Sequence, residues 1–107
     1  MPANIKKILG ELKKGLAAIY GDQLKAVILF GSYARGDAHP PDSDIAVMIV
    51  LKDEFDFKEA RNRSIEFVAS LCLENDVVIM RKFAAEKEYK ESKASLFLNI
   101  RNEGVTI

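Results

Sequence analysis

Apolar residues recur every three or four positions along the first twenty residues of the chain. This spacing is typical of an amphipathic helix with lysines and Glu11 on its polar sides. Asn4 is a suitable N-cap, and Gly21 is a suitable residue for the end of the helix. The residues predicted to form the apolar side are Ile5, Ile8, Leu9, Leu12, Leu16 and Ile19.

Two short apolar runs follow this helix. Lys25–Phe30 is rich in branched residues, and Asp44–Leu51 has the same character, so both are predicted to be buried strands. The polar segment between them contains Pro40 and Pro41, which do not suit the interior of a strand. The sequence therefore predicts two strands joined by a loop.

The second half of the chain predicts a helix, a strand and a helical tail. Asp56 is a suitable N-cap for a helix that runs to about Asn75, followed by a third strand over 76–80. A charged helix is expected near 84–92, then an apolar stretch over 95–100 and a short final strand over 104–107. The residues predicted to follow the inner edge of the second helix are Arg61, Ile65, Val68, Ala69 and Cys72. This order predicts an α/β or α+β layer fold, a small mixed β-sheet covered by helices.

Composition narrows the class of protein. The 107 residues fit a single domain over 1–107, with 49% hydrophobic and 30% charged residues. A formal net charge of +0 argues against broad electrostatic binding to nucleic acid or to an anionic membrane. The N-terminal residues have no uninterrupted apolar core, so neither a signal peptide nor a membrane span is expected. Cys72 is the only cysteine, which excludes an internal disulfide and favours a reducing, cytoplasmic location.

The segment FGSYARGDAHPPDSDIAV carries the candidate chemistry. Gly31 allows the backbone to approach a bound group closely, and a helix starting at Ser32 would direct N–H groups at an anion. Arg35 offers a planar cationic group suited to phosphate oxygens. A strand-to-helix turn with a capping serine and a surface arginine explains the same residues, and the Gly-Ser pair alone favours that simpler interpretation. The ending required of a P-loop is absent.

Acidic residues at the start of the strands suggest a metal site. Side chains two residues apart on a strand point to the same face, so acids at positions 44 and 46 would converge on one ion. Asp44 is present, but position 46 is Ala46. Asp76 opens the third predicted strand, from which it can approach Asp44. The alternative is that Asp44 and Asp76 are turn residues that end their strands.

The stretch GSYARGDAHPPDSDIAV resembles the nucleotidyltransferase signature of the DNA polymerase β superfamily, above all that of the minimal nucleotidyltransferases. The tail LFLNIRNEGVTI is similar to the end of that family. The resemblance implies the nucleotidyltransferase fold and Mg²⁺-dependent transfer of a nucleotidyl group, AMP from ATP, to a hydroxyl. It places the nucleotide phosphates at Gly31 and Ser32, with Arg35 beside them, and the first and third metal ligands at Asp44 and Asp76. It also implies an antitoxin role beside a HEPN-domain toxin, in a homo- or hetero-oligomer.

Ala46 departs from the family pattern, because the second metal-binding aspartate of the family falls on this position. Three explanations are open: an engineered alanine variant, a degenerate nucleotidyltransferase that neutralises a HEPN partner by contact, or replacement of the ligand from elsewhere. Asp37, Asp42 and Glu74 are the candidates for replacement, and this explanation is the least favoured. His39 and Tyr33 are expected to be exposed loop residues without a catalytic role.

Overall fold

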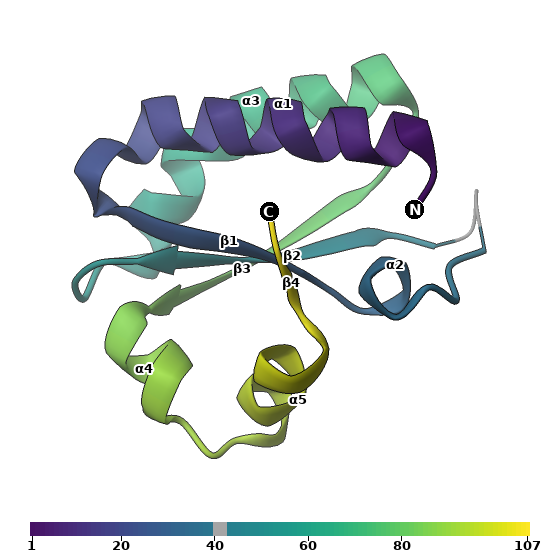
Figure 1. The fold of residues 1–107 in the computed structure, drawn as a ribbon. Coiled ribbons are helices and arrows are strands. Elements are labelled where there is room, and N and C mark those ends of the chain that lie inside the picture. Colours follow the sequence, from purple (N-terminus) through teal and green to yellow (C-terminus); the bar gives the residue numbers. More distant parts are fainter. Residues whose placement is uncertain (40–42) are drawn as a thin grey trace.

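The computed structural model describes residues 1–39 and 43–107. Pro40, Pro41 and Asp42 lie outside the described residues, so the prediction of a proline loop and the role considered for Asp42 are not addressed. The elements in chain order are α1 (Ala3–Tyr20), the 3₁₀ turn η1 (Gly21–Gln23), β1 (Leu24–Phe30), α2 (Ser32–Arg35), β2 (Ile45–Leu51), α3 (Phe57–Asn75), β3 (Ile79–Ala85), α4 (Glu86–Glu91), α5 (Ser95–Glu103) and β4 (Val105–Thr106) (Figure 1).

The four strands form one mixed sheet in the order β3-β2-β1-β4. β1 is antiparallel to β2 and to β4, whereas β3 runs parallel to β2. All seven residues of β2 are buried, because this strand lies inside the sheet and both of its faces are covered. The predicted fold class, a small mixed sheet covered by helices, is confirmed.

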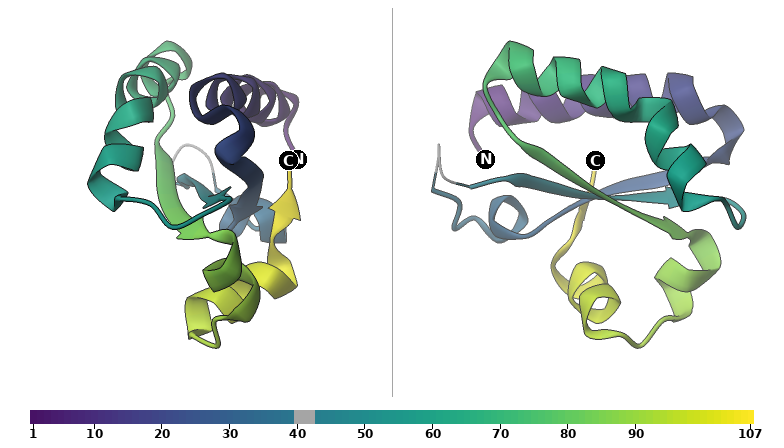
Figure 2. Two further views of the ribbon diagram at one scale, coloured as in Figure 1. Left: turned by 90° about the vertical axis from the view of Figure 1, so that its left-hand side faces the viewer. Right: turned by 180° about the vertical axis from the view of Figure 1, so that it is seen from behind.

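Helices cover the two faces of the sheet in separate layers. α1 and α3 lie side by side on one face, and α4 and α5 lie on the other (Figures 1 and 2). Alternate residues of β2 therefore enter two cores: Val47 and Ile49 pack toward α1 and α3, while Met48 packs with Ile100 of α5. None of the described helices combines the length and the apolar character needed to cross a membrane.

The amphipathic pattern of α1 predicted its buried side well. The residues of α1 that are buried are Ile5, Ile8, Leu9, Leu12, Leu16 and Tyr20. The predicted cap is wrong, because the helix already includes Asn4 and begins after Pro2, which makes no side-chain cap. Gly15 permits close packing of α1 on α3, since a Cβ there would lie 2.0 Å from the Phe67 ring.

The predicted inner edge of α3 is largely wrong. Ile65 is 41% exposed, and Arg61 and Ala69 are exposed as well. The residues of α3 that are buried are Ala60, Ser64, Val68 and Leu71. Ser64 was not among the predicted residues, and its hydroxyl is hydrogen-bonded inside the fold. The predicted N-cap is confirmed, because Asp56 accepts hydrogen bonds from the N–H groups of Lys58 and Glu59.

Ser64 belongs to a buried hydrogen-bond network between α1, α3 and β3. The Tyr20 hydroxyl lies 2.8 Å from Ser64 Oγ and donates to the carbonyl of Ala60 at 2.5 Å. Arg81 of β3 donates to Ser64 Oγ at 2.7 Å and to the carbonyl of Arg61 at 3.1 Å. Burial lowers the pKa of the Arg81 guanidinium from its ordinary value. The network ties the outer strand of the sheet to the helical layer.

The third strand lies further along the chain than predicted. β3 spans Ile79–Ala85, whereas the apolar run had indicated 76–80. β3 is one of the two edge strands of the sheet. Its Arg81 joins the hydrogen-bond network with α3 and its Lys82 is exposed, and these two charged residues interrupt the apolar pattern that predicts a strand. The charged helix consequently begins at Glu86 and not near 84.

Candidate functional site

A glycine turn connects β1 to the short helix α2. Gly31 has φ 78° and ψ −154°, a backbone conformation that residues with a Cβ rarely adopt. Its carbonyl accepts hydrogen bonds from the N–H groups of Ala34 and Arg35, at 3.1 and 3.0 Å. The N–H groups of Ser32 and Tyr33 are the first in the helix and have no carbonyl one turn before them. The turn therefore presents backbone donors beside the Ser32 hydroxyl.

The turn lies against the beginning of β2. Phe30 is the register partner of Ala46, and a Cβ added to Gly31 would lie 3.7 Å from the Cβ of Ala46. Ala46 is only 7% exposed. Position 46 thus adjoins the glycine turn directly, and the methyl group of Ala46 offers no ligand to a cation.

The two predicted carboxylate ligands lie at the same end of two neighbouring strands. Asp44 is exposed and directly precedes β2, whose first N–H, from Ile45, donates to the carbonyl of Val78 at 2.9 Å. Asp76 precedes β3 by three residues, and the two strands are parallel. The sequence predicts Asp76 as the first residue of the third strand. In the structure it is instead the left-handed C-cap of α3, with φ 52°. Its backbone conformation thus serves the helix end.

The described residues at this end of the sheet do not form a complete metal site. Within residues 1–39 and 43–107, no three His, Cys, Asp or Glu side chains gather closely enough to hold an ion. Mg²⁺ is commonly bound through one or two carboxylates together with substrate phosphates. Asp44 and Asp76 are the two carboxylates that the sequence predicts for such a site. The paired carboxylates that β2 would supply with an acid at position 46 are not formed.

Arg35, the predicted phosphate ligand, is paired with two carboxylates. Its guanidinium lies 3.3 Å from Asp37 and 3.6 Å from Glu103 at the end of α5. Next to Glu103, Gly104 packs so closely that an added Cβ would lie 2.4 Å from the carbonyl oxygen of Ile100. The pairing of Arg35 with Glu103 shows that the signature and the tail are neighbours in space. Both motifs are visible in the sequence, but neither of them indicates that they are in contact.

His39 and Tyr33, two further residues of the signature, differ in their exposure. His39 is exposed, and its N–H donates to Ser43 Oγ at 2.8 Å. Tyr33 is 7% exposed and packs into the core on the α1 side of the sheet, so the expectation for Tyr33 is wrong. A buried aromatic ring fixes the short helix α2 onto the sheet and with it the position of Ser32.

Comparison with known proteins identifies the family of this chain. The profile of the family described as "Nucleotidyltransferase domain" matches residues 5–99. The "Putative protein adenylyltransferase MJ0141" of Methanocaldococcus jannaschii is 36% identical over 104 residues, which cover 96% of this chain and 98% of that protein.

Two solved structures share the fold. A nucleotidyltransferase structure from Sulfolobus solfataricus matches with a TM-score of 0.65 and 22% identity, over 94% of this chain and 76% of that one. The tri-AMPylated HEPN toxin of Shewanella oneidensis in complex with its MNT antitoxin gives a match with a TM-score of 0.55 and 21% identity, over 92% of this chain and 68% of that one. The family match across almost the whole chain and the full-length relative show that this protein belongs to the nucleotidyltransferase domain family.

Proposed function

We propose that this protein transfers AMP from ATP to a hydroxyl group of a protein partner, with release of pyrophosphate and of the hydroxyl proton. The observation that carries the proposal is the contact between the Gly31 turn and the beginning of β2, with Asp44 two residues from that contact. The full-length relative named as a protein adenylyltransferase supports this choice of nucleotide and acceptor.

Each residue of the site has a proposed role. Gly31 permits close approach of the β and γ phosphates, and the Ser32 hydroxyl and the first N–H groups of α2 donate hydrogen bonds to them. Asp44 and Asp76 hold Mg²⁺ together with the phosphates, and the ion supplies neutralisation of phosphate charge. Arg35 reaches the nucleotide by exchanging its exposed pairing with Glu103 for a phosphate oxygen. The chain's contribution to catalysis is therefore orientation and charge stabilisation.

The proposed partner is a HEPN-domain toxin, which this protein would inactivate as an antitoxin. The support is the shared fold with an MNT antitoxin whose structure includes an AMPylated HEPN toxin. Such a pair forms a hetero-oligomer, and the proposed location is the cytoplasm, where the half-buried Cys72 stays reduced.

Ala46 favours a second candidate function, neutralisation of the partner by contact alone. The buried methyl group removes the paired carboxylates from β2, and loss of even an outer partner of a metal ligand commonly lowers activity about 10- to 100-fold. A protein that retains the fold without turnover would still present the same surface to its partner.

The deciding experiment compares the chain with Ser32→Leu and Ser70→Leu. Ser32→Leu places an apolar side chain where phosphate would approach, whereas Ser70 is an exposed serine on α3, away from the turn. Calorimetry with Mg²⁺ and ATP should show binding by the parent and by Ser70→Leu, and none by Ser32→Leu. Transfer of labelled AMP to a co-purified HEPN partner then separates the two candidates. Absence of ATP binding by the parent at millimolar nucleotide would reject the transferase proposal and leave neutralisation by contact.

A further inference from the structure

A groove runs along the outer edge of β3, away from the glycine turn. Two cavities of about 950 and 310 Å³ adjoin this edge and share Phe57, Phe83 and Glu88. The larger lies between the segment after β2 and α4, and the smaller extends past Lys82 to Phe97 of α5. We call the two together the β3 groove. The larger cavity lies at the end of β2, and the glycine turn lies at the beginning of β2. At the ordinary rise of a strand, the cavity and the turn are about 20 Å apart.

The floor of the β3 groove is aromatic. The ring of Phe83 lies 5.9 Å from that of Phe57 and 6.2 Å from that of Phe55, measured between centroids. Phe57 is the first residue of α3 and is 56% exposed. Asp56 caps the helix through its own side chain, so the start of α3 does not depend on the Phe57 ring. An exposed ring packed on other rings beside a cavity is typical of a docking surface.

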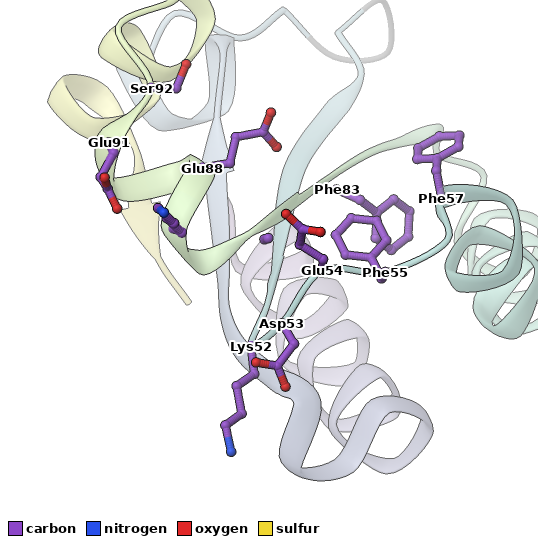
Figure 3. Close-up of a pocket in the computed structure, with 11 residues that line it drawn as sticks. Lys52, Asp53, Glu54, Phe55, Phe57, Phe83, Glu88, Glu91 and Ser92 are labelled. Atoms are coloured by element: carbon purple, nitrogen blue, oxygen red, sulfur yellow. The ribbon is translucent and has the colours of Figure 1, made fainter.

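The rim of the larger cavity carries an excess of negative charge, whereas the smaller cavity is lined by Arg81 and Lys82 and by one acid, Glu88. Asp53, Glu54, Glu88 and Glu91 line the larger cavity, against two lysines, Lys52 and Lys87. The carboxylates of Glu54 and Glu88 point into the space between α4 and the rings, whereas the Lys52 side chain extends away from the rings (Figure 3). Among the described residues, none of these four acids forms an ion pair within 4.0 Å.

Aromatic rings beside carboxylates favour a planar cation. A guanidinium stacks on ring faces and pairs with carboxylate oxygens, and it is more easily dehydrated than an ammonium group. The chain itself uses this chemistry twice: Arg63 lies 5.0 Å from the centroid of the Tyr20 ring, and Arg81 lies 5.7 Å from that of Phe83. Arg81 is fixed to Ser64 and to the Arg61 carbonyl, so an incoming cation would meet the exposed Phe57 ring.

We propose that the β3 groove binds an extended, arginine-bearing segment of a protein partner, which aligns along β3. Alternate residues of a strand point to opposite faces, so an arginine entering the phenylalanine cavity places its neighbour toward Leu96 and Phe97. A second copy of this chain fits poorly. Antiparallel pairing about the middle of β3 would set two Lys82 side chains opposite each other, which is unfavourable. The proposal is independent of the nucleotide site.

The test is an amide NMR titration of the whole chain, without nucleotide, with acetyl-Leu-Arg-Leu-Arg-Leu-amide. A peptide with glutamine at both arginine positions is the matched probe. We expect saturable shifts at residues of the β3 groove with the arginine peptide, and binding at least about fivefold weaker with the glutamine peptide. Shifts spread over the surface, equal binding of both peptides or no shifts at millimolar peptide would overturn the proposal.

Variants of exposed residues assign the site without threatening the fold. Phe57→Ala and Glu54→Gln with Glu88→Gln should each weaken binding of the arginine peptide about fivefold. Leu73→Ala removes an apolar side chain that is 84% exposed on α3, and Glu66→Gln removes a remote acid, so neither should change binding. Equal loss of peptide binding in all four variants would contradict the assignment. Concentration-dependent broadening of groove signals without peptide would also contradict it, and would identify a second copy as the occupant.

Discussion

Gly31 and Ala46 lie against each other where β1 leaves the sheet and β2 enters it, with 3.7 Å between an ideal Cβ on Gly31 and the Cβ of Ala46. The glycine supplies a turn that exposes donors, and the alanine occupies the strand position at which the resemblance places a carboxylate. Under the proposed function, binding and turnover of nucleotide are therefore separable at this contact. Donors of the turn do not depend on residue 46, but a second protein ligand for a metal does.

Ala46→Asp should raise Mg²⁺-dependent AMP transfer at least about tenfold, because it rebuilds paired carboxylates on one face of β2. Ala46→Asn has nearly the same shape without the charge and should not raise it. The activities of both variants are measured as transfer of labelled AMP to the partner. Equal rates in the parent and in Ala46→Asp would show that this chain does not use the second carboxylate.

The same variant should depend on metal for its stability. Position 46 is 7% exposed, so a carboxylate there without a cation should lower the free energy of unfolding by about 2 kcal/mol. Thermal unfolding should show that Mg²⁺ raises the Tm of Ala46→Asp more than that of the parent or of Ala46→Asn. If Mg²⁺ shifts all three equally, the ion does not bind at this position.

Two glycine-to-alanine changes should have opposite effects on stability. Gly31→Ala should lower the free energy of unfolding by about 1–3 kcal/mol, because the cost arises from φ 78° and not from crowding. Gly10 lies inside α1 with no atom within 4 Å of an added Cβ, so Gly10→Ala should stabilise by about 1 kcal/mol. Urea unfolding measures both. A destabilising Gly10→Ala would be inconsistent with the open space beside α1.

Asp76→Asn separates the C-cap from the proposed metal ligand. Asparagine tolerates the left-handed conformation, so stability should change by less than about 0.5 kcal/mol. Affinity for Mg²⁺-ATP should fall about tenfold, because an amide is a weaker ligand than a carboxylate. Calorimetry measures the affinity for Mg²⁺-ATP, and thermal unfolding of the same preparation measures the stability. Unchanged affinity would show that Asp76 does not bind the metal, so that Asp44 alone would remain of the two proposed protein ligands.

Ser64→Ala should lower the free energy of unfolding by about 1–2 kcal/mol, because Tyr20 and Arg81 each lose a buried partner. Ser70→Ala removes an exposed hydroxyl from the same helix and should be neutral within about 0.5 kcal/mol. Equal effects of the two substitutions in urea unfolding would argue against the network as a source of stability.

Local patterns determined the parts of this protein that depend on neighbours in sequence. The spacing of leucines and isoleucines fixed the buried side of α1, the branched runs fixed β1 and β2, and Asp56 marked the start of α3. The signature from Gly31 to Ala46 indicated the family because its residues lie in one continuous stretch of the sequence. Each of these properties is set by interactions within a few residues, which a sequence displays directly.

Tertiary structure decided the features in which distant segments meet. Arg35 contacts Glu103 across 68 positions, and the signal for that pairing is present in neither motif alone. Ser64 is buried because Tyr20 and Arg81 satisfy its hydroxyl, so a polar residue entered the core against the pattern of its own helix. β3 carries charges because it is the outer strand, and the position of a strand in the sheet follows from packing of the whole chain.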